Sequence, residues 1–250
     1  MSMVILSTMP PEEAELEDEA SLLRELNAIS NRHSAQRYAL SSSSGNTKAT
    51  SCSIRASASS SFSSAFLQDA PEDQQLNQYW YSQTTIDTLR EAVLEGVASL
   101  DKDAPRVAFL STPSLFFAFE ETERQSFFLF DFDSKATWSK DANYIYYDYN
   151  HPLRFDETLY NSFDVVVIDP PFITSEVWDK YAQTAKALAV SDQPLVVATT
   201  VVENAPLMKE LFDATPTEFQ PSIPNLVYQY ACFTSFPCVC LSQPNEEIAL

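Results

Sequence analysis

Residues 164–172 constrain the fold of this chain more than any other stretch. Three valines and an isoleucine at positions 165–168 predict a strand buried on both faces, as in the centre of a parallel sheet. Pro170 and Pro171 then end the strand abruptly, because they fix φ, remove two amide donors and force Asp169 toward an extended backbone. Open α/β sheets bind their ligands at the carboxyl ends of such strands.

The elbow after this strand presents three groups with useful chemistry. They are the carboxylate of Asp169, the carbonyl of Pro170 and the ring of Phe172. Acceptors beside a flat ring suit a neutral amine, because the acceptors orient its N–H bonds while the ring screens it from water. The alternative interpretation is a plain turn at the end of a strand, since Asp-Pro commonly begins turns.

Strand-like and helix-like segments alternate around this elbow. A helix is expected to begin at a cap formed by Ser82 or Thr84 and to end near Gly96. We expect strands at 107–110, 127–130, 144–147, 165–168 and 195–198, helices at 113–123, 174–189 and 203–211, and a closing antiparallel pair at 226–233 and 238–241. This alternation predicts an α/β fold with a mostly parallel sheet, helices on both of its faces and an antiparallel hairpin at one edge.

The first part of the chain has a different composition. Residues 12–25 predict a short acidic helix, and residues 41–64 are about half serine with almost no large apolar side chains. Such a segment buries too little surface to offset the entropy lost on ordering. We therefore expect residues 1–73 to form a largely disordered tail and residues 74–250 to form the folded domain.

Charge and cysteine content limit the partners and the compartment. From residue 76 onward the chain has 25 acidic and 10 basic residues, a net charge of −15, which opposes binding to a phosphate backbone and favours a basic partner. The four cysteines show no pairing pattern, which indicates a reducing compartment, and we expect a cytoplasmic monomer. Cys238 and Cys240 lie in an apolar stretch and are predicted to be core thiols; no metal site is expected. No apolar run is long enough to span a membrane.

Several segments together resemble one enzyme family. Asp169-Pro170-Pro171-Phe172 resembles the (Asp/Asn)-Pro-Pro-(Tyr/Phe) motif of amino-group methyltransferases that use S-adenosylmethionine. Segments 78–82, 107–115 and 147–153 are similar to those of a narrower group, first labelled adenine-N6 methyltransferases and now regarded as lysine methyltransferases of translation elongation factor 1-alpha. The resemblance implies the class I methyltransferase fold, with a Rossmann-like sheet of seven strands.

The resemblance also implies a set of cofactor-binding residues. The loop after residues 107–110 lacks the usual glycines, but its small hydroxyl residues still allow close approach to the cofactor. Asp131 and Asp133 stand 20 and 22 residues after Ser111, the spacing at which an acid meets ribose hydroxyls, although a solvated strand end explains either acid equally well. The expected cofactor contacts are Ser111, Ser114, Asp131, Asp133, Asp148, Gln78 and Trp80. For Asp148 a turn cap, and for Trp80 a place in the core, are the structural alternatives.

Three functions remain open at this point. The resemblance implies a protein-lysine N-methyltransferase that acts on elongation factor 1-alpha, with Asp169, Pro170 and Phe172 at the methyl-transfer site. The same elbow would suit an exocyclic amine, so a nucleic-acid adenine-N6 methyltransferase is the second hypothesis, which the negative charge opposes. The glycine-free loop motivates the third, a non-catalytic binding module.

Overall fold

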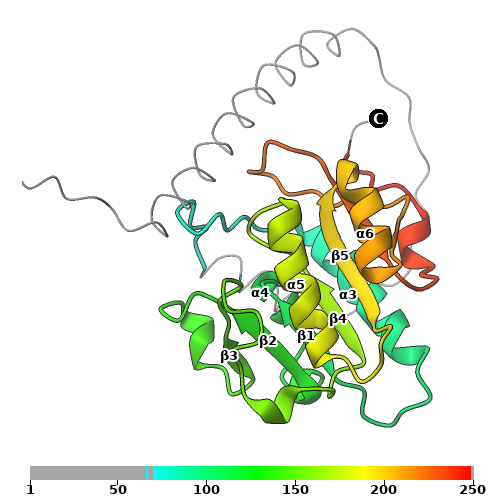
Figure 1. The fold of residues 1–250 in the computed structure, drawn as a ribbon. Coiled ribbons are helices and arrows are strands. Elements are labelled where there is room, and N and C mark those ends of the chain that lie inside the picture. Colours follow the sequence, from blue (N-terminus) through cyan, green and yellow to red (C-terminus); the bar gives the residue numbers. More distant parts are fainter. Residues whose placement is uncertain (1–65, 67–69, 249–250) are drawn as a thin grey trace, which may run out of the picture. The chain divides into compact units, whose positions relative to one another are not determined.

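A seven-stranded sheet runs through the folded part of the chain (Figure 1). The computed structural model describes Phe66 and residues 70–248; the acidic helix expected at 12–25 and the serine-rich segment lie outside these residues. The strand order is β3 (Tyr144–Tyr146), β2 (Phe127–Asp131), β1 (Val107–Leu110), β4 (Val165–Ile168), β5 (Leu195–Val201), β7 (Tyr230–Thr234) and β6 (Thr215–Pro216).

The direction of the strands confirms the predicted architecture. Strands β1 to β5 pair in parallel, whereas β7 runs antiparallel to both β5 and β6. The chain builds β1, β2 and β3 toward one edge and then returns to place β4 beside β1. This reversal of strand order between β1 and β4 is the topological switch point at which open α/β sheets bind ligands.

Helices cover both faces of the sheet. The helices are α3 (Gln83–Ala98), α4 (Pro113–Phe116), α5 (Ser175–Leu188) and α6 (Ala205–Phe212), with short 3₁₀ turns at Arg124–Ser126, Thr137–Lys140, Glu157–Leu159, Val202–Asn204 and Cys240–Ser242. Figure 1 shows α5 and α6 in front of the sheet and α3 behind it. The predicted cap is confirmed, because Ser82 Oγ accepts a hydrogen bond from the Thr85 amide at 3.2 Å. Across the described part of the chain, the helices are too short or too polar to cross a membrane.

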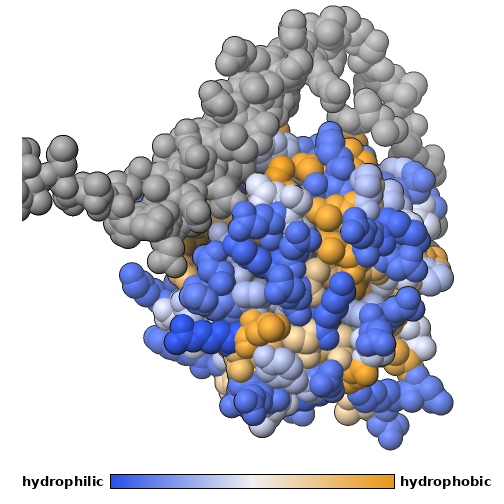
Figure 2. All heavy atoms as spheres, in the orientation of Figure 1, coloured by the Kyte–Doolittle hydropathy of each residue, from blue (hydrophilic) through white to orange (hydrophobic). Residues whose placement is uncertain are grey.

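Successive side chains of the central strands point to opposite faces of the sheet and join two separate hydrophobic cores. Val165 and Val167 join the core beneath α3, whereas Val166 and Ile168 join the core beneath α5 and α6. Because all four side chains are buried, β4 is the doubly covered strand that its composition predicts. Outside these cores, Figure 2 shows hydrophilic residues over much of the visible face, with smaller hydrophobic patches between them.

Gly96 lies inside α3 rather than at its end. The helix continues to Ala98, so the expected helix end near Gly96 is two residues too early. A Cβ atom at this position would lie 2.9 Å from Cζ of Phe236. The glycine therefore permits the Phe236 ring to pack directly on the backbone of α3.

Two predicted elements differ from the observed ones. The helix expected at 113–123 ends at Phe116, because the amides of Ala118 and Phe119 bond to carbonyls three residues back and the carboxylate of Glu123 captures the amide of Glu120. The strand expected at 238–241 is absent, and β6 is instead the antiparallel partner of β7 at the sheet edge.

Two hydrogen bonds to Glu95 explain why the segment after β7 does not form a strand. The carboxylate of Glu95 on α3 accepts the amide hydrogens of Val239, at 2.6 Å, and Cys240, at 2.9 Å. These bonds satisfy the amides that a strand would have paired with a neighbour, and the chain turns into the 3₁₀ helix Cys240–Ser242. Cys238 and Cys240 are only partly buried and pack against the core beneath α3, so the predicted core thiols lie at its margin.

The domain boundary expected at residue 74 remains a prediction. Two described residues before it pack against the core. The Phe66 ring is 5.4 Å from that of Trp80, and the carbonyl of Ala70 accepts the indole N–H of Trp80 at 2.8 Å.

Candidate active site

The strand register brings four residues into one row at the carboxyl edge of the sheet. Leu110 of β1 pairs with Phe130 of β2 and with Ile168 of β4, and Ile168 pairs with Ala198 of β5. The residues that follow these partners are Ser111, Asp131, Asp169 and Thr199. Backbone hydrogen bonds fix the row, because the Ser111 amide bonds to the Phe130 carbonyl at 2.8 Å and the Asp169 amide to the Leu110 carbonyl at 3.2 Å.

Asp169 is held by two hydroxyl groups. The hydroxyl of Tyr81 donates to Asp169 Oδ2 at 2.5 Å and lies 2.6 Å from Oγ1 of Thr199. Asp169 keeps part of its surface exposed. Burial of its carboxyl group nevertheless raises its pKa to about 7, although the hydrogen bonds from Tyr81 and Thr199 oppose this shift. Near neutral pH the group is therefore divided between its acid and its carboxylate forms.

The elbow that follows Asp169 is braced from the N-terminal side of the domain. The side-chain amide of Asn77 donates to the carbonyl of Pro171, and Asn77 itself has a positive φ of 53°. Asparagine tolerates this left-handed conformation better than most residues. Phe172 is partly exposed, and its ring centroid lies 6.3 Å from that of Tyr149 in an edge-to-face arrangement. Pro170 is buried.

The loop after β1 adopts the backbone conformation that glycine usually provides. Ser111 has a φ of 56°, and its hydroxyl lies 2.6 Å from the hydroxyl of Tyr181 on α5. Next to it, the Thr112 hydroxyl is buried and has no hydrogen-bond partner among the described residues. Ser114 is also buried, in the first turn of α4. The loop thus combines a fixed backbone with a buried hydroxyl that lacks a partner.

A second buried carboxyl group lies on the other side of this loop. Asp131 is 5% exposed, and its Oδ1 accepts the Asp133 amide at 2.9 Å and the Trp138 indole N–H at 3.4 Å. Burial raises the pKa of Asp131 to about 6, although these two hydrogen bonds oppose the shift. Asp133 turns its own carboxylate to the amides of Lys135 and Ala136. Among the described residues, Oδ2 of Asp131 accepts no hydrogen bond and is available to a further donor.

Asp148 and Trp80, which were also predicted to bind the cofactor, have contacts that serve the fold. Asp148 Oδ1 accepts the Asn150 amide at 2.9 Å, which is the turn cap considered above. Trp80 is 8% exposed and sits within the core, with its indole N–H bonded to Ala70. Gln78 is partly exposed and precedes this tryptophan by two positions.

Sequence reasoning did not single out Asn77, Tyr81, Thr199 or Tyr181. Their signals in the sequence are weak. Tyr81 belongs to an aromatic cluster that is typical of a core, and Thr199 is a hydroxyl residue directly after an apolar strand. Asn77 and Tyr181 lie in segments with no motif, and only the fold brings them to Pro171 and Ser111.

Comparison with known proteins identifies the family of this chain. Residues 72–238 match the family model described as "Probable N6-adenine methyltransferase". The chain is 30% identical over 183 residues to Protein-lysine N-methyltransferase M142.8 of Caenorhabditis elegans, an alignment that covers 69% of this chain and 82% of the relative. It is 30% identical to Protein-lysine N-methyltransferase EFM5 of Saccharomyces cerevisiae, with 67% and 73% covered, and 31% identical to human EEF1A lysine methyltransferase 1, with 66% and 75% covered. The chain therefore belongs to this methyltransferase family, together with these protein-lysine N-methyltransferases.

Proposed function

We propose that this methyltransferase uses S-adenosylmethionine to methylate a lysine of translation elongation factor 1-alpha. The observation that carries the proposal is the Asp169 carboxyl group, which follows the central strand at the switch point and is held by Tyr81 and Thr199. The names of the human and other vertebrate relatives supply the protein substrate. The net charge of −20 for the whole chain suits a basic partner.

The residues around the switch point fit the cofactor. The buried Thr112 hydroxyl has no partner among the described residues, and such a group is expected to receive one from a bound polar ligand. Oδ2 of Asp131, which has no donor among the described residues, is available to a ribose hydroxyl, and Ser111 fixes the loop between Thr112 and Asp131. We assign Ser111, Ser114 and Asp131 to this cofactor site. For Asp133, Asp148, Gln78 and Trp80 a cofactor contact remains a prediction, because Asp148 caps a turn and Trp80 lies in the core. When bound, the cofactor supplies an electrophilic methyl group on a sulfonium sulfur.

Asp169 is proposed to orient the substrate amine and to accept its proton. A lysine ammonium group with a pKa near 10.4 must lose a proton before its nitrogen can attack. Transfer to an ordinary aspartate, with a pKa near 3.9, costs about 9 kcal/mol. Because burial raises the pKa of Asp169 to about 7, the same transfer costs about 4.6 kcal/mol, as much as release to water at pH 7. Asp169 is thus a better proton acceptor than an exposed aspartate.

Aromatic rings beside the elbow suit the aliphatic stem of lysine. Phe172 meets Tyr149 edge to face, and Tyr149 in turn stacks on Tyr181 with a centroid distance of 6.2 Å. These rings would exclude water from the amine, while the Pro170 carbonyl and the Asp169 carboxylate accept hydrogen bonds from its N–H groups. Positioning and desolvation of the amine supply most of the rate enhancement in this proposal.

Radiolabelled cofactor tests the proposal. Full-length protein is incubated with purified elongation factor 1-alpha and labelled S-adenosylmethionine, and Asp169→Ala is compared with Asp179→Ala, which removes an exposed carboxylate from α5. We expect label on a lysine of the elongation factor with the wild type and with Asp179→Ala, and loss of at least tenfold in rate with Asp169→Ala. Full turnover by a folded Asp169→Ala protein would refute the assigned role.

The same assay separates the alternative functions. A parallel reaction with total nucleic acid in place of the elongation factor tests the adenine hypothesis, which would place the label on an adenine amino group. Absence of S-adenosylmethionine binding in calorimetry would instead favour a non-catalytic module. We further propose a cytoplasmic location, because Cys232, Cys238 and Cys240 form no disulfide among the described residues, and we propose that the enzyme acts as a monomer.

A further inference from the structure

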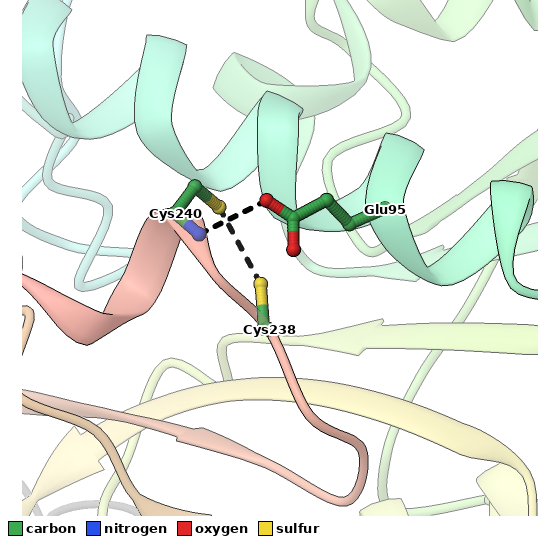
Figure 3. A group of neighbouring side chains, drawn as sticks. All are labelled: Glu95, Cys238 and Cys240. Atoms are coloured by element: carbon green, nitrogen blue, oxygen red, sulfur yellow. Dashed lines mark hydrogen bonds between the residues drawn. The ribbon is translucent and has the colours of Figure 1, made fainter.

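Three side chains with metal-ligating atoms converge at the far end of α3 from the candidate active site. Glu95 lies on α3, and Cys238 and Cys240 lie on the segment after β7 (Figure 3). Their ligand atoms all lie within 4.8 Å of one another, and the two sulfur atoms are 3.4 Å apart. Glu95 follows the helix cap Ser82 by 13 residues, which places it about 20 Å along the helix from Tyr81 and the methyl-transfer site.

The spacing of the ligand atoms is close to that around a tetrahedral zinc ion. Zn–S bonds of about 2.3 Å and Zn–O bonds of about 2.1 Å place two sulfur ligands about 3.8 Å apart, and a sulfur and an oxygen ligand about 3.6 Å apart. The observed sulfur separation of 3.4 Å needs only a small adjustment of two partly buried side chains. Figure 3 shows both thiols and the carboxylate directed toward a common point between the helix and the segment.

The carboxylate is already oriented by the backbone. Glu95 accepts the amides of Val239 and Cys240, one on each oxygen. Both thiols also hydrogen-bond to this carboxylate and so face its remaining lone pairs. Hydrogen bonds to a ligating carboxylate are the usual means of fixing its direction in metal sites. The site is therefore preorganised on the helix side.

The thiols are also suited to a cation. Partial exposure leaves a path for an ion to enter. Thiolate sulfur with one carboxylate oxygen selects a borderline-soft divalent ion over calcium or magnesium.

We propose that Glu95, Cys238 and Cys240 bind one Zn²⁺ ion, with a water molecule at the fourth position. The ion joins α3 to the segment after β7, two elements that also contact each other through the Glu95 hydrogen bonds, a hydrogen bond from Cys240 Sγ to the Thr88 carbonyl and packing of Phe236 against Gly96. Its role is to stabilise this junction, and it takes no part in methyl transfer. A disulfide between Cys238 and Cys240 is the competing outcome.

Cobalt titration of the full-length protein tests this site. Reduced, metal-free protein is titrated with Co²⁺, whose thiolate charge-transfer bands report sulfur ligation, and bound Zn²⁺ is measured by competition. Cys238→Ser, Cys240→Ser and Glu95→Gln are compared with Cys232→Ala, which removes a buried thiol that lies outside the group. Circular dichroism verifies that each variant is folded.

We expect one Co²⁺ per chain, displacement by Zn²⁺, and a rise in the melting temperature on adding Zn²⁺. Each cysteine variant should lose the charge-transfer bands, Glu95→Gln should weaken binding at least tenfold while it retains both thiols, and Cys232→Ala should match the wild type. The proposal is overturned if the reduced protein gives no thiolate bands, if Glu95→Gln binds as tightly as the wild type, or if mass spectrometry of protein purified under reducing conditions finds Cys238 and Cys240 as a disulfide.

Discussion

The hydroxyl of Tyr81 should set the pH at which the enzyme becomes active. It donates to Asp169 at 2.5 Å and favours the carboxylate form, against the burial that raises the pKa to about 7. A hydrogen bond to a charged group contributes about 1.5–3 kcal/mol. At 1.36 kcal/mol per pH unit, Tyr81→Phe should raise the pKa of Asp169 by a further 1–2 units, roughly.

The loss of activity should therefore depend on pH. At pH 7 the ionised fraction of Asp169 falls from about one half to between about a tenth and a hundredth, so the variant should be about 5- to 50-fold slower. Above about pH 9 the deficit should narrow, because both proteins then approach full ionisation. The two rates are compared as a ratio, because titration of the substrate lysine affects both proteins equally and cancels.

The assay is the ratio of kcat/KM for the wild type and Tyr81→Phe between pH 6 and 9.5, roughly, with saturating cofactor. Tyr147→Phe is the matched control, because the hydroxyl of Tyr147 is also buried but lies 2.8 Å from Thr184. Its ratio should not vary with pH. A Tyr81→Phe ratio that is equally independent of pH would refute the link between this hydroxyl and the ionisation of Asp169.

Three further variants test the energetics of the fold. Asp169→Asn should stabilise the protein more at pH 8 than at pH 5. The folded pKa of Asp169, about 7, exceeds the unfolded value of 3.8, so the free energy of unfolding of the wild type falls by up to about 4 kcal/mol as the pH rises through this window. Equal shifts of the denaturation midpoint at both pH values would contradict this. Gly96→Ala should lower the free energy of unfolding by about 1–3 kcal/mol because the new Cβ meets Phe236, and adding Phe236→Leu should recover much of that loss in urea denaturation. Asp164→Ala should cost about 2–3 kcal/mol, because it leaves the partly buried Arg106 amide without its acceptor and removes the ion pair with Lys102; a melting temperature within 1 °C, roughly, of the wild type would count against it.

The sheet was predictable where composition and burial agree. The apolar runs at Val107–Leu110 and Val165–Ile168 coincide with the observed strands, because a strand covered on both faces must be apolar at every position. The hairpin was misplaced because the segment at 238–241 is as apolar as a strand. A single carboxylate from Glu95, 143 residues earlier than Cys238, redirects it, and no local pattern encodes such a contact.

The candidate site was predictable only at the ends of strands. Asp131 and Asp169 follow apolar runs directly, so their place at the carboxyl edge follows from the strand assignment. Tyr81 and Thr199 reach Asp169 from 88 and 30 residues away in the sequence, and their contact depends on strand order and register. The raised pKa of Asp169 results from the way these parts enclose it, and composition alone does not contain this information.

The left-handed conformation of Ser111 bears on how tightly and how quickly the loop can receive its ligand. A glycine at this position would move among several conformations before binding, and each would have to be given up on complex formation. Ser111 has a φ of 56° and its hydroxyl contacts that of Tyr181, so we expect it to sample fewer conformations than a glycine would. The left-handed backbone of Ser111 thus carries a small strain in the free enzyme, and the loop should lose little conformational entropy when it binds its ligand.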